Sequence, residues 1–181
     1  EVEQRRHGAK AGSHPHAEDR IRRMPGAHTF GCVATYFDII DYGPGAEFYH
    51  GARYDLAGYD VSTAAVIAAP LRHKTAAAVE QAIKSRLGPG EVFSWTRSDD
   101  AHELNEALEA CGGTHFPGPP HSPNSNIVER FILTFGDLQR MTFAQSGFPP
   151  FWRPAVAIAS AQQWNIHRQT VRKDVDDVEI T

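Results

Sequence analysis

The chain has 181 residues, of which 41% are hydrophobic and 22% are charged. This length and composition are typical of one globular domain with a buried core. No run approaches the roughly 18 consecutive apolar residues that a membrane-spanning helix needs, so no transmembrane segment is predicted. No signal-peptide pattern is visible, and neither the compartment nor the oligomeric state follows from the composition.

The net charge of −4 is unevenly distributed. Residues 1–25 contain six of the 18 Lys and Arg residues but four of the 22 Asp and Glu residues, so this segment carries +2 and the remainder −6. The segment lacks hydrophobic periodicity and is predicted to be a disordered basic arm. Because an acidic body repels phosphate, nucleic acid is not favoured as a partner.

Three strands are predicted in the first half of the domain. Residues 27–40 are rich in β-branched and aromatic side chains on both faces, which is typical of a central strand. The Asp-Tyr-Gly-Pro-Gly of residues 41–45 breaks this strand, and residues 47–54 return as a second one. Residues 61–69 form the third candidate, which Pro70 ends.

Two helices and a short strand follow. Thr75 is a good N-cap, and apolar residues recur every four positions until the Gly-Pro-Gly of residues 88–90 ends the first helix. Residues 91–96 are predicted as a short strand. A second helix is predicted over residues 100–111, with capping-box spacing at its start and a Gly-Gly stop after its end.

The last part of the domain begins with a loop rich in Pro and His over residues 114–121. Ser122 is a good N-cap and Pro123 suits the first helical position, so a helix is predicted to start here. Residues 148–154 form a rigid aromatic loop. Residues 156–164 are predicted as a last strand, although their many Ala residues leave a helix possible.

Together these elements predict an α+β fold, in which an antiparallel sheet of four to six strands packs against about three helices. The predicted single domain spans residues 26–167. It lies between the basic arm of residues 1–25 and a polar tail of residues 168–181.

The predicted helix start near Ser122 is the strongest candidate for chemistry. The first turn of a helix has unpaired N–H groups and the positive end of the helix dipole, which stabilise an anion. Ser125 lies in that turn, where spare amides could serve as an oxyanion hole. Ser and Asn are also common at helix starts because they cap well, so a purely structural role is the alternative.

The segment Pro123-Asn124-Ser125-Asn126, followed by an apolar helix, resembles the Gly-Pro-Asn-Ser-Asn hallmark of an uncharacterised bacterial family. That arrangement in turn resembles the circularly permuted papain-like superfamily, which includes NlpC-type peptidases and lecithin–retinol acyltransferase relatives. Active members carry a His on an early strand and an Asn-Cys pair that opens a later helix. His28 and Asn124-Ser125 occupy these places here.

The resemblance implies a permuted papain-like fold and a hydrolase or acyltransferase that acts on an amide or ester bond. His28 would act as the base and Ser125 as the nucleophile, and Asn124 would help to stabilise the oxyanion. The substrate would be a small molecule, a lipid or a peptide, and no cofactor is implied. The predicted substrate-binding residues are Asn126, His121, Phe151 and Trp152.

A third catalytic residue that orients His28 is not identified. Asp38 lies on the same predicted strand but ten residues away, which is too far along an extended chain to touch His28. His50 and Asp60, from neighbouring strands, are better placed.

Two alternatives remain open. Serine stands where the superfamily has cysteine, and its hydroxyl is far less ionisable than a thiol, so the chain could be an inactive papain-like domain that binds a peptide, lipid or protein partner. In the second alternative, His102, His115 and His121 could bind zinc together with a carboxylate. No HExxH or CxxC spacing supports the second alternative, and no metal is predicted.

Overall fold

A computed structural model of the chain describes residues 31, 34–44, 48–87, 91–117 and 127–176. In chain order the elements are β1 (Thr35–Asp41), η1 (Tyr49–Gly51), β2 (Tyr54–Asp60), β3 (Val66–Leu71), α2 (Ala76–Lys84), β4 (Trp95–Ser98), α3 (His102–Ala110), β5 (Thr114–Pro117), α4 (Ile127–Ser146), η2 (Pro150–Trp152) and α5 (Arg153–Asp176). Among the described residues no helix is both long and apolar enough to span a bilayer. The predicted division into arm, domain and tail stays a prediction.

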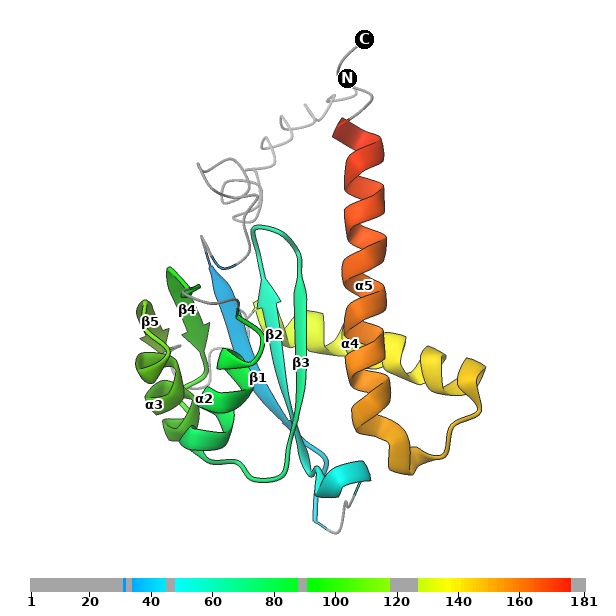
Figure 1. The fold of residues 1–181 in the computed structure, drawn as a ribbon, viewed down its shortest axis with the longest axis horizontal. Helices are drawn as coiled ribbons and strands as arrows, with labels where there is room; N and C mark the ends of the chain where they lie inside the picture. Colours follow the sequence, from blue (N-terminus) through cyan, green and yellow to red (C-terminus); the bar gives the residue numbers. More distant parts are fainter. Residues whose placement is uncertain (1–30, 32–33, 45–47, 88–90, 118–126, 177–181) are drawn as a thin grey trace, which may run out of the picture.

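The strands lie side by side in one sheet with the order β3-β2-β1-β4-β5 (Figure 1). β1 pairs with β2, and β2 with β3, in antiparallel directions, whereas β1 pairs with β4, and β4 with β5, in parallel. α2 and α3 are the crossovers that return the chain to the start of the next parallel strand. The sheet is therefore mixed, and the predicted antiparallel α+β sheet is wrong. Local patterns predicted strands, but they do not encode the direction in which distant strands pair.

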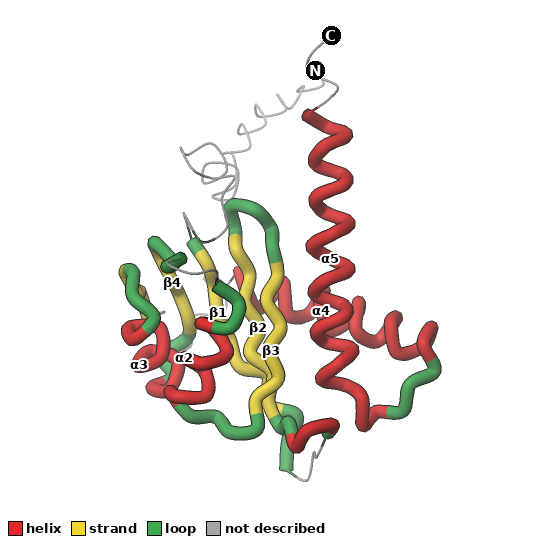
Figure 2. The backbone as a smooth tube through the Cα atoms, viewed as in Figure 1, coloured by secondary structure: helices red, strands yellow, loops and turns green. Residues whose placement is uncertain are grey.

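Helices cover both faces of the sheet (Figure 2). On one face lie α2 and α3, and Phe37 of β1 packs there with Leu108 of α3 in a first core. On the other face lie α4 and α5, and Tyr36 of β1 packs there with Phe131 of α4 in a second core. Because consecutive residues of β1 point into different cores, this strand is buried on both sides, as its apolar pattern predicted.

The predicted helix after Thr75 is confirmed. The Thr75 hydroxyl caps α2 by accepting the backbone N–H of Ala78 at 3.4 Å. α3 begins at His102, slightly later than predicted. Asp100 does not cap this helix through its first N–H groups, because its carboxylate accepts instead from the Asn105 side chain at 3.1 Å.

Three other segments differ from the prediction. Residues 47–54 contain the 3-10 turn η1 and only the first residue of β2. Residues 114–117, predicted as loop, form β5; Gly113, at φ +86°, lets the backbone approach β4 so closely that a Cβ would lie 1.8 Å from the Phe93 carbonyl oxygen. Residues 156–164 lie in α5, because their Ala-rich composition favours the helix.

α5 covers the outer edge of the sheet at β3. The backbone N–H of Val66 donates to Asn165 Oδ1 at 2.8 Å, and Asn165 Nδ2 donates to the Val66 carbonyl at 2.9 Å. One turn of this edge is further held by Trp164, whose Nε1 donates to the Ala64 carbonyl at 2.9 Å. These bonds occupy backbone groups that an open edge would offer to another strand.

Candidate active site

The order of the strands reverses between β1 and β4. From β1 the chain continues to β2 and β3 on one side, and α2 then carries it back to β4 on the other side. In open α/β sheets, ligands bind outside the carboxyl ends of the strands at such a reversal. Two aspartates lie at this place: Asp38 within β1, and Asp99 directly after the last residue of β4.

The register of the two strands places these aspartates at one level. Tyr36 pairs with Arg97 in the parallel ladder, and each aspartate lies two residues further along its own strand. Side chains alternate along strands, so Asp38 shares the sheet face of Tyr36, which is the face covered by α4. The Asp38 carboxylate is half-buried and accepts the N–H of Ile39 at 2.7 Å, while Asp99 is exposed.

Lys74 lies within electrostatic reach of both aspartates. Its ammonium is 2.7 Å from the Glu103 carboxylate, and its pKa is raised by the hydrogen bond to Glu103 and by the charges of Glu103, Asp99 and Asp38. The same hydrogen bond lowers the pKa of Glu103. Three carboxylates thus face one ammonium, and this local excess of negative charge favours a cation.

A basic loop lies at the same end of the sheet. Residues 72–74, Arg-His-Lys, connect β3 to α2, and all three are exposed. β3 runs in the same direction as β1, so its carboxyl end lies at the same end of the sheet as those of β1 and β4, although β2 separates β3 from β1. Exposed Arg and Lys side chains next to a carboxylate pair can contact phosphate oxygens of a bound nucleic acid strand.

A hydrogen-bond network holds the loop that carries Asp99. Asn105 of α3 donates to Asp100 at 3.1 Å, and its Oδ1 lies 2.9 Å from His115 Nε2. The other ring nitrogen of His115 lies 3.1 Å from the Thr96 hydroxyl of β4. Burial lowers the pKa of His115, so the ring is neutral near pH 7. The network fixes the turn after β4 against α3 and β5.

The zinc alternative finds no support in the described part of the chain. His115 is engaged in this network, and the side chain of His102 is 91% exposed, with Nε2 3.9 Å from Glu106. No group of three or more His, Cys, Asp and Glu side chains that could hold a metal ion occurs among the described residues. His121 lies outside them.

The two aspartates fit a hard divalent cation better than they fit zinc. Mg²⁺ takes oxygen donors and is commonly held by one or two protein carboxylates together with substrate phosphates. Asp38 and Asp99 supply such a pair, with the Lys74 ammonium already placed beside them.

Most of the site residues predicted from the sequence lie outside the described residues. These are His28, His121, Asn124, Ser125 and Asn126. The proximity of the His28 ring to the Ser125 hydroxyl, on which the hydrolase hypothesis depended, therefore stays a prediction.

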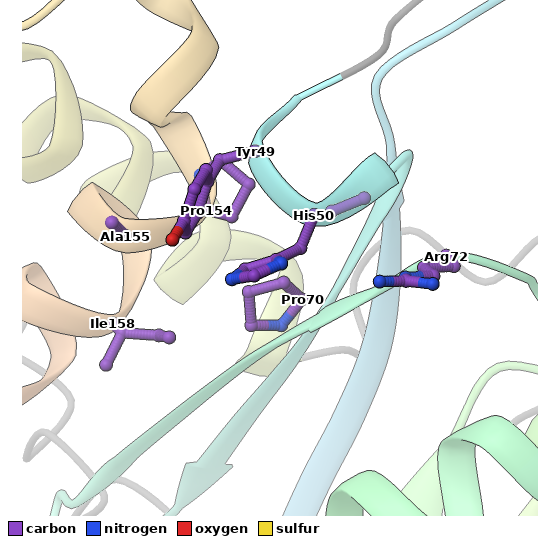
Figure 3. Close-up of a pocket in the computed structure, with 8 residues that line it drawn as sticks. Tyr49, His50, Pro70, Arg72, Pro154, Ala155 and Ile158 are labelled. Carbon is purple, nitrogen blue, oxygen red and sulfur yellow. The ribbon is translucent and has the colours of Figure 1, made fainter.

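Phe151 and Trp152, the other two predicted substrate-binding residues, pack against Tyr49. Trp152 stacks on the Tyr49 ring with a centroid distance of 4.5 Å, and Phe151 meets it edge-on at 5.9 Å. Tyr49 also lines a cavity of about 200 Å³ between η1, the end of β3 and the start of α5 (Figure 3). None of the described residues that line this cavity is a carboxylate, so it offers no anionic oxygen donor to a hard cation.

A second carboxylate region lies inside the sheet. Asp55 of β2 is fully buried, and burial raises its pKa to about 7. One of its oxygens accepts from the Tyr42 hydroxyl at 3.3 Å, and Oδ1 has no hydrogen-bond partner among the described residues. The guanidinium of Arg153 lies 4.2 Å from the centre of the Tyr42 ring. Asp55 therefore belongs to a buried structural cluster.

Comparison with solved structures identifies the fold, whereas no protein-family model and no curated protein matches the sequence. The chain aligns with a simian T-cell lymphotropic virus intasome in complex with the PP2A regulatory subunit B56 gamma (17% identity, TM-score 0.53, 69% of this chain and 46% of that chain). It aligns with the HTLV-2 integrase catalytic core domain in complex with magnesium (15% identity, TM-score 0.50, 71% of this chain and 80% of that chain). It also aligns with the catalytic core domain of BIV integrase (15% identity, TM-score 0.50, 82% of this chain and 99% of that chain). The fold is RNase H-like.

The match corrects the interpretation drawn from residues 123–126. A five-stranded mixed sheet in the order 3-2-1-4-5, shared with integrase cores, is incompatible with a permuted papain-like fold. The inferred amide or ester hydrolase and the inactive papain-like binding domain are wrong on the same ground. The choice of a small molecule, lipid or peptide substrate rested on the papain-like resemblance and is wrong with it. Residues that cap a helix well can precede a helix in unrelated folds.

The sequence predicted no joint role for the two aspartates at the strand reversal. Asp38 was considered only as a partner of His28, and Asp99 was not considered. The available signal was an acidic residue between Phe37 and Ile39 in an apolar strand, because a carboxylate in such surroundings is costly unless it has a role.

Proposed function

We propose that the chain binds nucleic acid and catalyses phosphoryl transfer at its phosphodiester bonds, with a divalent cation held by Asp38 and Asp99. The observation that carries this proposal is the register of β1 and β4, which brings two aspartates 61 residues apart in sequence to one level at the strand reversal. Two of the matched structures are described as integrase catalytic core domains, and one of them is in complex with magnesium.

The residues around the pair have separate tasks in this proposal. Asp38 and Asp99 would hold the cation through their carboxylate oxygens. A divalent cation supplies a Lewis acid for the phosphoryl oxygens. Arg72 and Lys74 contact backbone phosphates and set the register of the bound strand without reading its sequence.

The net charge of the chain does not oppose this function. Phosphate responds to the charges near it, because interactions between exposed charges fade over about 10 Å at 0.1 M salt. The exposed Lys74 lies near the carboxylates, and a cation held by Asp38 and Asp99 would neutralise them. The acidic body is therefore not expected to repel a phosphate that lies at the site of Asp38 and Asp99.

Cleavage and joining of labelled DNA and RNA oligonucleotides by the full chain tests the proposal. We expect activity that requires Mg²⁺ or Mn²⁺, is lost in excess chelator, and falls at least about 100-fold in Asp38→Asn and in Asp99→Asn. Asp41→Asn is the matched control, because this carboxylate lies on the same strand but accepts the N–H of Gly43 at 2.8 Å in a turn. It should keep activity within about threefold.

Activity that is equal with and without the divalent cation would rule out the proposed role of the pair. The same conclusion follows if Asp38→Asn and Asp99→Asn remain as active as the Asp41→Asn control.

A further inference from the structure

Two large aromatic side chains lie exposed beside each other on β4 and β5. Trp95 is 57% exposed and Phe116 is 46% exposed. Their ring centroids are 5.4 Å apart and the ring planes meet at 42°. Such a pair presents aromatic faces to the solvent, which is unfavourable in water unless another molecule covers them.

The aromatic pair shares a sheet face with the candidate active site. Thr96 and Ser98 are buried on the α3 side, so Trp95 and Arg97 point to the opposite side of β4. Arg97 is in register with Phe116 of β5 and with Tyr36 of β1.

The same face leads along β4 to the carboxylates. Trp95, Arg97 and Asp99 follow one another at two-residue steps, which places the indole about 13 Å along the chain from Asp99. The helices on this side have their main contacts with β1, β2 and β3. The pair therefore lies beyond the part of the sheet that α4 and α5 cover.

We propose that Trp95 and Phe116 form a stacking platform for unpaired bases of the nucleic acid strand next to the bond on which Asp38 and Asp99 act. This inference rests on the proposed function and narrows its substrate to nucleic acid with a single-stranded segment at the site. Aromatic side chains that alternate with basic ones are how proteins hold single strands: each base stacks on a ring while cations contact the phosphates. Arg97 lies between the platform and the carboxylates and supplies the cation.

A second copy of the chain is a poorer occupant of this surface. Stable protein interfaces bury roughly 800 Å² on each partner around an apolar centre. Here the two rings are flanked on the same face by Arg97 and by the exposed Thr114. β5 has four residues and ends in Pro117, which has no N–H to donate, so it is also a poor edge for pairing with another strand.

Binding of a fluorescent oligothymidylate of about 12 nucleotides to the full chain, measured by anisotropy in excess chelator, tests the platform. We expect Trp95→Ala and Phe116→Ala each to weaken binding about tenfold, because one stacked base is lost in each variant. Trp95→Phe should keep most of the affinity. Binding of a blunt duplex should change less than about twofold in all three variants, because paired bases are not free to stack.

Phe148→Ala is the matched control. Phe148 is also an exposed aromatic residue, at 56%, but it lies in the connection between α4 and α5. It should bind the oligothymidylate as the unsubstituted chain does, and circular dichroism should confirm that all variants fold. Unchanged oligothymidylate binding by Trp95→Ala and Phe116→Ala would overturn the proposal. So would an equal loss on the single strand and the duplex, or a change in sedimentation without a change in affinity, which would indicate a contact between copies.

The platform and the catalytic proposal fail in different ways. If Asp38→Asn abolishes cleavage while Trp95→Ala binds oligothymidylate normally, the platform is wrong and the active site stands. If Trp95 is needed for binding but no cation-dependent cleavage or joining occurs, the platform stands and the catalytic proposal is wrong.

Discussion

The sheet holds aspartates in two contrasting settings. Asp38 lies half-buried within β1, Asp99 lies exposed directly after β4, and the Lys74 ammonium is near both. Asp55 lies inside the antiparallel half, fully buried, with Tyr42 donating to one oxygen. Its partner across the ladder is Pro70, which has no N–H to offer.

The difference shows that topology, rather than residue type, decides what a carboxylate can do. At the strand reversal Asp99 is exposed and Asp38 is half-buried, so both carboxylates can exchange water for a cation. Between paired strands the charge is desolvated, so Asp55 holds its proton up to about pH 7. A neutral carboxyl binds a cation poorly. Replacing Asp by Asn should therefore abolish cation binding at Asp38 and Asp99, whereas at Asp55 it should leave cation binding unchanged and stabilise the fold.

The largest expected effect concerns the pH dependence of stability at Asp55. The folded pKa of about 7 exceeds the ordinary 3.8, so this group stabilises the fold fully below pH 4 and loses that contribution as the pH rises towards 7. The loss is up to about 4 kcal/mol. Asp55→Asn should remove it, so that the variant gains stability relative to the unsubstituted chain between pH 4 and pH 7. Urea unfolding at several pH values measures this difference; parallel curves for the two proteins would contradict it.

A smaller effect is expected at Lys74, whose replacement should raise the affinity for a cation and lower the affinity for an oligonucleotide. Lys74→Gln removes an ammonium near Asp38 and Asp99, so the affinity for Mn²⁺ should rise about threefold. Oligonucleotide binding should weaken, and the slope of log K against log salt should fall by about one, because one phosphate contact is lost. Titrations at several salt concentrations check both effects. If the affinities for the cation and for the oligonucleotide change in the same direction, Lys74 does not act on them as described.

The smallest expected effect is at the cap that positions the Lys74 loop. Thr75→Ala removes the hydroxyl that accepts from Ala78 at the start of α2 and should lower the free energy of unfolding by about 1 kcal/mol. Thr75→Ser keeps the hydroxyl and should be close to neutral. Equal losses in the two variants, measured by urea unfolding at pH 7, would show that the cap does not contribute.

Local features of this fold were predictable from the sequence. Thr75 and the apolar repeat behind it predicted α2 because capping and helical periodicity are properties of neighbouring residues. The apolar run around Phe37 predicted a strand buried on both faces for the same reason. Residues 156–164 were ambiguous because a short Ala-rich apolar segment fits either a strand or a buried helix.

The pairing of strands and the candidate active site could not be predicted in this way. The parallel register of β1 with β4 depends on the crossover through α2 and on packing in two cores, none of which a local pattern encodes. Asp38 and Asp99 come to one level of the sheet only through that register. The motif at residues 123–126 gave a misleading signal because good capping residues satisfy a helix start in any fold.

Binding of Mn²⁺ to the chain without nucleic acid would show whether Asp38 and Asp99 form a cation site, because Mn²⁺ accepts the oxygen donors that suit Mg²⁺ and its free form is seen by electron paramagnetic resonance. We expect a Mn²⁺ site that is lost in Asp38→Asn and in Asp99→Asn and kept in Asp55→Asn. Equal Mn²⁺ binding by the unsubstituted chain and by the Asp38 and Asp99 variants would contradict it.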